Sequence, residues 1–292
     1  MIDTAITNLG SGILLGTYVS GSDAWHNLRA GAVGGSQVGA ILGINPWESA
    51  YTAWAKACNL LTSDFEQSMP MKLGSAFEAP IREIFAAENP FLKVYETGTW
   101  AKVGAEWQHA NPDGIIEHGD GELEILEIKF SRNPWYSGVP LHYKYQVLWY
   151  MHITGIRLGR IVTVAGGDFQ EFEVVWDQFE VDSMLATVEA WKRCVDEVSA
   201  PDWDGSKSTY ETVRAISPEI TELESFELGQ LWELLAVAQD AYEVAEKELN
   251  KCKSAVIAEA QGAKYGLYDG VPVLSLNSRN GGLPYITYKK GK

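Results

Sequence analysis

Three charged residues in the middle of the sequence have the types and spacing of a chemical site. Asp113 lies in a Pro-Asp-Gly turn, and Glu127 and Lys129 stand two residues apart in the mostly apolar run 123–130. Burying a charge is costly unless the charge is paired or binds a metal ion. The sequence therefore predicts that these three side chains compensate one another, with or without a metal.

Two predicted strands would position this group. The His-Gly-Asp-Gly turn at 118–121 indicates that residues 115–117 and 122–130 form adjacent antiparallel strands. Because side chains alternate along a strand, Ile125, Glu127 and Lys129 should share one face. Residues 124, 126, 128 and 130 should share the other, and Asp113, at the start of the hairpin, should lie near the charged face.

An acidic residue at a turn followed by Glu-x-Lys on the next strand resembles the PD-(D/E)xK nuclease superfamily. Oxygen ligands such as Asp113 and Glu127 suit Mg²⁺ or Mn²⁺, and a second ion roughly 4 Å away would complete a two-metal site. Lys129 would orient or deprotonate the attacking water and neutralise developing negative charge. The resemblance also implies that the backbone carbonyl of Ile128 is a metal ligand.

A glycine-rich segment near the N-terminus offers a candidate phosphate pocket. Gly34-Gly35-Ser36 reads as a turn with Ser36 as the N-cap of a helix ending near Gly43, and Arg29 closes a preceding short helix. The alternative is a simple helix cap beside a surface arginine. Trp-His-x-Leu-Arg-x-Gly followed by this Ser resembles the YqaJ and lambda-type exonuclease family, whose Arg and Ser hold the 5′-phosphate of a DNA end.

The predicted helix over 69–87 carries two further candidates. Phe77, Ile81, Ile84 and Phe85 recur at helical spacing and should bury one face, although Pro80 suggests a kink or a helix start. The Gly…Glu-Pro pattern around Glu78 resembles the family segment whose Glu reaches the metal, except that Ala79 separates Glu78 from the proline; an exposed helix glutamate is the alternative. Met71 matches the family position of an apolar wedge at the duplex end, or else fills the core.

A third predicted helix, over 142–154, places Gln146 and Tyr150 four residues apart on one face. This pattern resembles the family motif in which the glutamine hydrogen-bonds near the scissile phosphate and the aromatic residue supports it. A buried glutamine bonded to backbone is the alternative. The resemblance also places Asn111 in the DNA-binding set. His109, His118 and His142 are not at zinc-ligand spacing, and we expect them to be non-catalytic.

The composition limits the mode of nucleic-acid binding and the cellular compartment that we expect for this protein. The chain has 292 residues and a net charge of −16, which argues against nonspecific nucleic-acid binding over the whole surface but allows a local basic channel. Three cysteines without CxxC spacing indicate neither a disulfide framework nor a zinc knuckle and fit a reducing cytoplasm, in a bacterial or phage-infected cell. We find no signal peptide and expect no membrane span.

The chain divides into an N-terminal arm at 1–22, a nuclease domain at 23–200, a linker at 201–217 and a C-terminal appendage at 218–292. The appendage joins a helical stretch over 218–261, with a break near Gly229, to strands over 263–290. Its helix carries a near-heptad apolar seam formed by Leu231, Leu234, Leu235, Ala238, Ala241, Tyr242, Ala245 and Leu249. The appendage could pack on the core, mediate subunit contacts or meet DNA through Lys289, Lys290 and Lys292.

The sequence thus predicts an α/β PD-(D/E)xK restriction-endonuclease-like core, with a mixed central sheet flanked by helices, and an α+β appendage. By resemblance, the protein is a metal-dependent 5′→3′ exonuclease on linear double-stranded DNA with 5′-phosphate ends, and leaves 3′ single strands for an annealing protein. The resemblance also implies a ring-shaped trimer. The alternatives are a structure- or sequence-specific endonuclease and a catalytically silent DNA-end-binding scaffold.

Overall fold

The computed structural model describes residues 9–18, 22–61, 68–220, 225–279 and 281–288. The chain separates into two compact units, residues 1–218 and residues 219–292. Residues 1–8 and 19–21 of the expected arm at 1–22, and the lysines at 289, 290 and 292, lie outside the described residues.

A five-stranded mixed sheet forms the centre of the first unit, in the order β3-β6-β7-β8-β9. Its strands are β3 (Lys93–Tyr95), β6 (Gly114–Glu117), β7 (Leu123–Ser131), β8 (Leu158–Ala165) and β9 (Asp168–Val175). All neighbours are antiparallel except β7 and β8, which are parallel. A parallel pair needs a crossover, which helix α5 (Leu141–Thr154) provides.

The predicted hairpin of residues 115–117 and 122–130 is confirmed. Strands β6 and β7 pair from Gly114 with Leu126 to Glu117 with Leu123, and Gly121 takes a positive φ of 86° in the turn between them. Strands β8 and β9 turn at Gly166 and Gly167, both with positive φ. Glycine adopts this backbone conformation without steric cost, so the turns and the register of β7 follow from the sequence.

A second sheet lies in the order β1-β4-β5-β2. It comprises β1 (Gly12–Gly16), β4 (Thr99–Lys102), β5 (Ala105–Ala110) and β2 (Val33–Gly34). The prediction of a loose N-terminal arm is therefore wrong for residues 12–16, which pair antiparallel with β4. Gly12 permits this, because a Cβ there would lie 2.9 Å from the carbonyl oxygen of Ile153.

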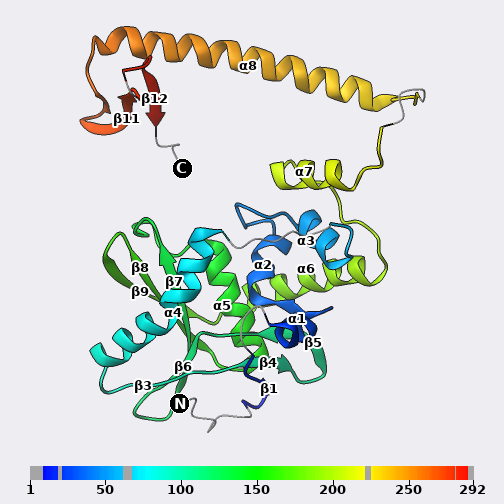
Figure 1. The fold of residues 1–292 in the computed structure, drawn as a ribbon, viewed down its shortest axis with the longest axis vertical. Helices are drawn as coiled ribbons and strands as arrows, with labels where there is room; N and C mark the ends of the chain where they lie inside the picture. The colour runs from blue at the N-terminus through cyan, green and yellow to red at the C-terminus, as the bar shows by residue number, and fades with distance from the viewer. Residues whose placement is uncertain (1–8, 19–21, 62–67, 221–224, 280, 289–292) are drawn as a thin grey trace. The chain divides into compact units, whose positions relative to one another are not determined.

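Helices cover the central sheet on both faces (Figure 1). On one face, α5 packs with α2 (Gly35–Ile41), α3 (Ala50–Ala57) and α6 (Gln178–Asp196) around a core that includes Ile125 and Ile161. On the other face, α4 (Met69–Glu88) buries Ile81 and Phe85 against Leu126 and Ile128. The alternation predicted for β7 is confirmed. The short helix α1 (Asp23–Arg29) precedes β2.

Helix α4 differs from the expectation in two respects. It runs through Pro80 as one helix, and its buried stripe is narrower than predicted, because Phe77 and Ile84 are 40% and 52% exposed. Phe77 instead stacks on Phe130, with ring centroids 4.9 Å apart, near the rim of the sheet.

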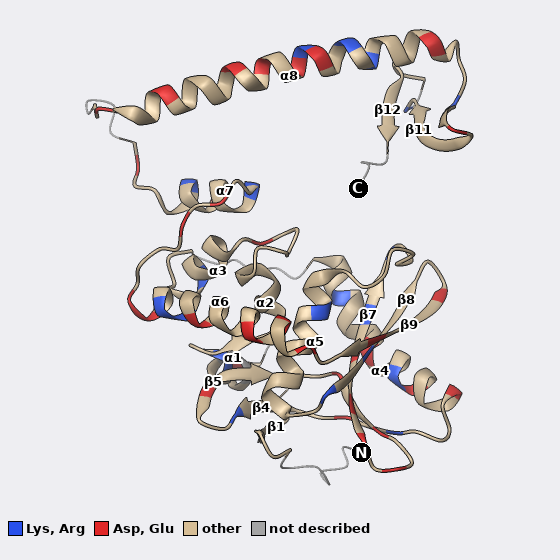
Figure 2. Cartoon of the chain, turned by 180° about the vertical axis from the view of Figure 1, so that it is seen from behind, with Lys and Arg blue, Asp and Glu red and all other residues tan. Residues whose placement is uncertain are grey.

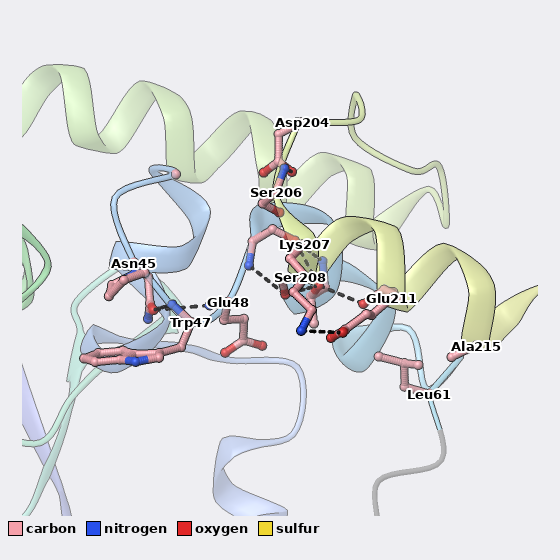
Figure 3. Close-up of a pocket in the computed structure, with 15 residues that line it drawn as sticks. Asn45, Trp47, Glu48, Leu61, Asp204, Ser206, Lys207, Ser208, Glu211 and Ala215 are labelled. Atoms are coloured by element: carbon pink, nitrogen blue, oxygen red, sulfur yellow. Dashed lines mark hydrogen bonds and ion pairs between the residues drawn. The ribbon is translucent and has the colours of Figure 1, made fainter. Parts of the chain in front are cut away.

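The linker predicted over 201–217 is wrong for its second half. Residues Lys207–Ile216 form helix α7, which packs on α3 through hydroxyl groups. Thr52 Oγ1 lies 2.7 Å from Ser208 Oγ and 2.8 Å from Thr212 Oγ1. A cavity of about 550 Å³ lies beside this contact, and residues 43–49 and 204–215 supply most of its lining (Figure 3). The Pro, Asp, Gly and Ser residues at 201–208 indicated a linker, but the hydroxyls of Ser208 and Thr212 bond to a neighbouring helix.

The second unit contains the long helix α8 (Gln230–Ala260), which begins directly after Gly229. A three-stranded antiparallel sheet follows, in the order β10 (Tyr265–Tyr268), β11 (Val271–Asn277) and β12 (Tyr285–Tyr288). The predicted α+β character of this region is confirmed. Among the described residues, no helix combines the length and the apolar character needed to cross a membrane.

Candidate active site

Asp113 and strand β7 are held together directly. Asp113 ends the turn between β5 and β6, and its Oδ2 accepts a hydrogen bond of 2.7 Å from the backbone N–H of Ile128. Arg82, from helix α4, donates to the carbonyl oxygen of Asp113 at 2.9 Å. The Pro-Asp-Gly turn is thus fixed to the strand that carries Glu127 and Lys129, and also to the helix that covers it.

The two carboxylate oxygens of Glu127 have different surroundings. Oε1 accepts hydrogen bonds from Lys129 Nζ and, at 2.7 Å, from Gln146 Nε2. Oε2 is buried and has no hydrogen-bond partner among the described residues. A buried polar atom is normally paired, so Oε2 is a candidate ligand atom of this site.

Gln146 and Tyr150 support Glu127 from helix α5. Gln146 Nε2 also approaches Tyr150 Oη at 2.8 Å, and both side chains are buried. Gly35 fits closely against them, because a Cβ there would lie 2.4 Å from Tyr150 Cε1 and 3.1 Å from Gln146 Cγ. The predicted Gln-x-x-x-Tyr face is therefore directed at the carboxylate.

Arg29 lies next to this group. A Cβ on Gly34 would be 3.0 Å from Arg29 Nη2, so the guanidinium is placed against the backbone at the start of α2. Burial lowers the pKa of Arg29. Burial, and next the charges of Glu127 and Asp113, raise the pKa of Tyr150, and the charge of Arg29 acts against this increase. Ser36 is exposed in the first turn of α2, but it is not the N-cap; that residue is Gly34, whose N–H is bonded to Gln37.

Glu78 approaches the same site from α4, where it is half-buried. Burial, and next the charge of Asp113, raise the pKa of Glu78 to about 7. Met71 lies seven residues earlier and is 45% exposed; two helical turns put it on the same side of α4 as Glu78. Asn111 lies at the other end of the Asp113 turn, and its Nδ2 donates to Thr99 Oγ1 at 2.5 Å.

The pKa shifts show that the site has too little positive charge for its carboxylates. Burial and the neighbouring Asp113 raise the pKa of Glu127 to about 8, and burial also raises the pKa of Asp113. Burial acts against the charge of Lys129, but Glu127 and Asp113 outweigh it and raise its pKa. One ammonium group therefore does not fully compensate two buried carboxyl groups.

A divalent cation fits this arrangement. Asp113 and Glu127 supply hard oxygen ligands, Glu127 Oε2 has a free lone pair, and added positive charge would lower both raised pKa values. No set of three His, Cys, Asp or Glu side chains in the described part of the chain is arranged to hold a metal. The ligand set of Asp113, Glu127, the Ile128 carbonyl and Glu78 therefore stays a prediction.

Sequence reasoning did not assign a role to three neighbours of this site. Arg82 follows Glu78 by four residues on α4, a spacing that could have indicated a shared face. The ring of Tyr143 lies 5.0 Å from Lys129 Nζ. His142 packs edge-on against Trp47 at 5.3 Å, and burial together with Lys129 lowers the pKa of His142.

The fold has known counterparts. The structure is similar to that of an alkaline exonuclease (LHK-Exo) from Laribacter hongkongensis, with 20% identity, a TM-score of 0.51 and coverage of 61% of this chain and 94% of that chain. A second structure, LHK-Exo in complex with dAMP, matches with 18% identity, a TM-score of 0.52 and the same coverage. The first unit thus has the PD-(D/E)xK type of core that the sequence predicted.

The sequence also resembles known proteins. The family model for the YqaJ-like viral recombinase domain matches residues 24–157. Over 262 residues, the chain is 24% identical to the uncharacterized protein YqaJ of Bacillus subtilis (strain 168). The alignment covers 84% of this chain and 80% of the relative. Residues 24–157 are thus similar to the YqaJ-like viral recombinase domain.

Proposed function

We propose that this protein is a metal-dependent deoxyribonuclease that degrades linear double-stranded DNA in the 5′→3′ direction from 5′-phosphate ends. The observation that carries the proposal is the set of buried Glu127 with half-buried Asp113 and Lys129, in which Glu127 Oε2 has no partner among the described residues. The family and the fold shared with an alkaline exonuclease support the same class of reaction.

Asp113, Glu127 and the carbonyl of Ile128 would hold Mg²⁺ or Mn²⁺, and Glu78 would add a ligand or position a second ion. When bound, the ion supplies Lewis-acid polarisation of a phosphate oxygen and favours formation of hydroxide. Burial opposes the charge of Lys129, but Glu127 and Asp113 raise its pKa. Lys129 would orient or deprotonate the attacking water and neutralise negative charge that develops on the phosphate.

Gln146 and Tyr150 fix the direction in which Glu127 presents its free oxygen. Gln146 bonds Oε1, and Tyr150 holds Gln146 in turn. This arrangement leaves Oε2 for the ion. Gln146 is thus a positioning residue as well as a candidate contact to the DNA backbone.

Arg29 and Ser36 would bind the terminal 5′-phosphate. Arg29 lies against the first residues of α2, beside Tyr150, so a phosphate held there would be close to the carboxylates. Guanidinium groups bind phosphate through two parallel hydrogen bonds. Asn111 and Met71 would meet the DNA near the same place, with Met71 as the apolar wedge at the duplex end.

The product, a 3′ single strand, would pass to a single-strand annealing protein in phage-type recombination. The family resemblance implies a ring-shaped trimer that encloses the DNA. Such a ring could combine an acidic exterior with a basic lining that faces the DNA.

End preference tests this proposal. We would compare a 5′-phosphorylated linear duplex, a 5′-hydroxyl duplex and a closed circle, each with Mg²⁺. We expect faster degradation of the phosphorylated duplex, loss of this preference in Arg29→Ala, and retention in Arg193→Ala, which changes an exposed arginine on α6. Cutting of the circle would indicate an endonuclease, and binding of ends without cleavage in Mg²⁺ or Mn²⁺ would indicate a scaffold.

A further inference from the structure

Helix α8 carries an apolar seam with a strict heptad repeat. Steps of four and three residues alternate from Leu231 to Val256, and the eight seam positions are Leu231, Leu235, Ala238, Tyr242, Ala245, Leu249, Cys252 and Val256. A repeat of 3.5 residues maintained over this length is typical of a coiled coil. None of the residues of α8 is buried within the described part of the chain; Leu231, Leu235 and Tyr242 are about 60% exposed.

We propose that the seam of α8 pairs with the same seam of a second copy of this chain, in antiparallel orientation. This inference concerns residues 230–260 and does not depend on the reaction that the first unit catalyses. Two observations on α8 select both the partner and the direction.

The first observation is the size of the seam residues. In a parallel pair each residue faces its own copy, so Ala238 and Ala245 would form two empty layers next to a crowded layer of two Tyr242 rings. In an antiparallel pair the facing residues are Tyr242 with Ala245, Ala238 with Leu249, Leu235 with Cys252, and Leu231 with Val256. Every layer then combines a larger and a smaller side chain, which fills space as cores require.

The second observation is the distribution of charge along the helix. Residues 230–245 contain Glu233, Asp240 and Glu243 and no lysine or arginine. The second half of α8 contains all three of its lysines, at 247, 251 and 253, as the blue segments in Figure 2 show, together with three glutamates, at 246, 248 and 259, so it carries no net charge. Antiparallel pairing brings the acidic half beside the half that contains the lysines, whereas parallel pairing would place two acidic halves together.

The flanking positions agree with this direction. In the antiparallel register, Trp232 lies across from Lys253 of the second copy, where an ammonium group can meet the indole face. The opposed helix directions also place the two helix dipoles in a favourable arrangement. The resulting contact is isologous, so each α8 pairs with the α8 of one other copy. This contact is separate from the trimer that the family resemblance implies.

Cys252 provides a direct test in the full-length chain, since it is exposed and has no disulfide partner among the described residues. Antiparallel pairing puts it next to position 235 of the second copy and, at about 1.5 Å per residue over 17 residues, roughly 25 Å from the other Cys252. Under mild oxidation we expect a disulfide-linked dimer from Leu235→Cys. We expect none from the native chain or from the Leu235→Cys/Cys252→Ser control. Linkage of the native chain, abolished by Cys252→Ser, would show parallel pairing, and failure of Leu235→Cys to link would show that another surface covers the seam; either result overturns the proposal.

A matched pair of substitutions tests the seam without a cysteine. Tyr242→Glu places a charge in the seam, whereas Val244→Glu places the same charge two residues away, on a side of α8 outside the seam where Val244 is 68% exposed. In the Leu235→Cys background, we expect Tyr242→Glu to reduce disulfide-linked dimer at least tenfold and Val244→Glu to leave it within twofold. Equal effects of the two substitutions would contradict the assignment of the interface.

Discussion

Gln146 Nε2 donates to Glu127 Oε1 over 2.7 Å and so determines which oxygen of the buried carboxylate is free. Lys129 bonds the same oxygen, and Oε2 remains without a partner among the described residues. The orientation of a ligand carboxylate thus depends on a glutamine that belongs to a different element. Such supporting contacts commonly change metal affinity or activity by about 10- to 100-fold when they are removed.

We therefore expect Gln146→Leu, which keeps the volume but removes the amide, to lower kcat about 10- to 100-fold. Tyr150→Phe removes only the hydroxyl partner of Gln146 and should have the smaller effect. Circular dichroism would establish that both variants fold, and single-turnover cleavage would measure the rates. A Gln146→Leu enzyme with the native rate would show that Glu127 does not need this contact.

The close approach of Gly35 to Tyr150 predicts a second effect. Gly35→Ala adds a methyl group 2.4 Å from the Tyr150 ring; such overpacking costs about 1–3 kcal/mol, and the displaced ring would also loosen Gln146. Gly74→Ala is the control, since no described atom lies within 4 Å of a Cβ there and alanine favours a helix by up to about 1 kcal/mol.

Thermal unfolding and DNA cleavage would be measured for both variants. We expect a lower Tm and lower activity for Gly35→Ala, and a Tm equal to or above the native value for Gly74→Ala. Equal Tm changes in the two variants would contradict the packing that we describe around Tyr150.

Metal binding should be visible as stabilisation. A cation that binds the folded chain alone raises its stability, by about 2.7 kcal/mol at 100 times the Kd. We expect Mn²⁺ to raise the Tm of the native chain and of Glu117→Gln, which changes a strand glutamate paired with Lys93. Asp113→Asn should abolish the shift. A Tm shift of native size in Asp113→Asn would place the metal elsewhere.

His152 predicts a pH dependence of stability that is separate from the site. Burial, and next the charges of Lys102 and Arg157, lower the pKa of His152 to about 4, against about 6.5 in an unfolded chain. Between these values the unfolded state binds more protons, so the free energy of unfolding should decrease as pH falls from 6.5 to 4 and level off below 4.

Urea unfolding at several pH values would measure this effect against His152→Asn, which does not titrate. The native chain should lose more stability than the variant between pH 6.5 and 4, while both behave alike above pH 7. Identical profiles would show that the environment of His152 does not lower its pKa.

The sequence allowed the centre of the site to be predicted because local rules determine it. Turn residues set the hairpin of β6 and β7, strand alternation put Glu127 and Lys129 on one face, and helical spacing paired Gln146 with Tyr150. These contacts join residues that are close in sequence or on regular elements.

The features that were not predicted depend on long-range packing. Residues 12–16 pair with β4, Arg82 reaches the carbonyl of Asp113, and the hydroxyls of α7 bond to α3. The sequence of each segment is equally compatible with a surface loop or an exposed helix. Only contact with the partner element determines which structure the segment adopts. The exposed Phe77 has the same explanation, because its stacking partner Phe130 lies on β7.

The central claim is that Asp113, Glu127 and Lys129 form a hydrolytic site for DNA. The most direct measurement is the rate of nucleotide release from a linear 5′-phosphorylated duplex in Mg²⁺, for the native chain and for Lys129→Met, with EDTA as the metal-free control. We predict release by the native chain, none with EDTA, and at least about a 100-fold slower rate for the folded variant, since lost electrostatic stabilisation costs that much. Equal rates for the two proteins, or release that persists in EDTA, would contradict the account.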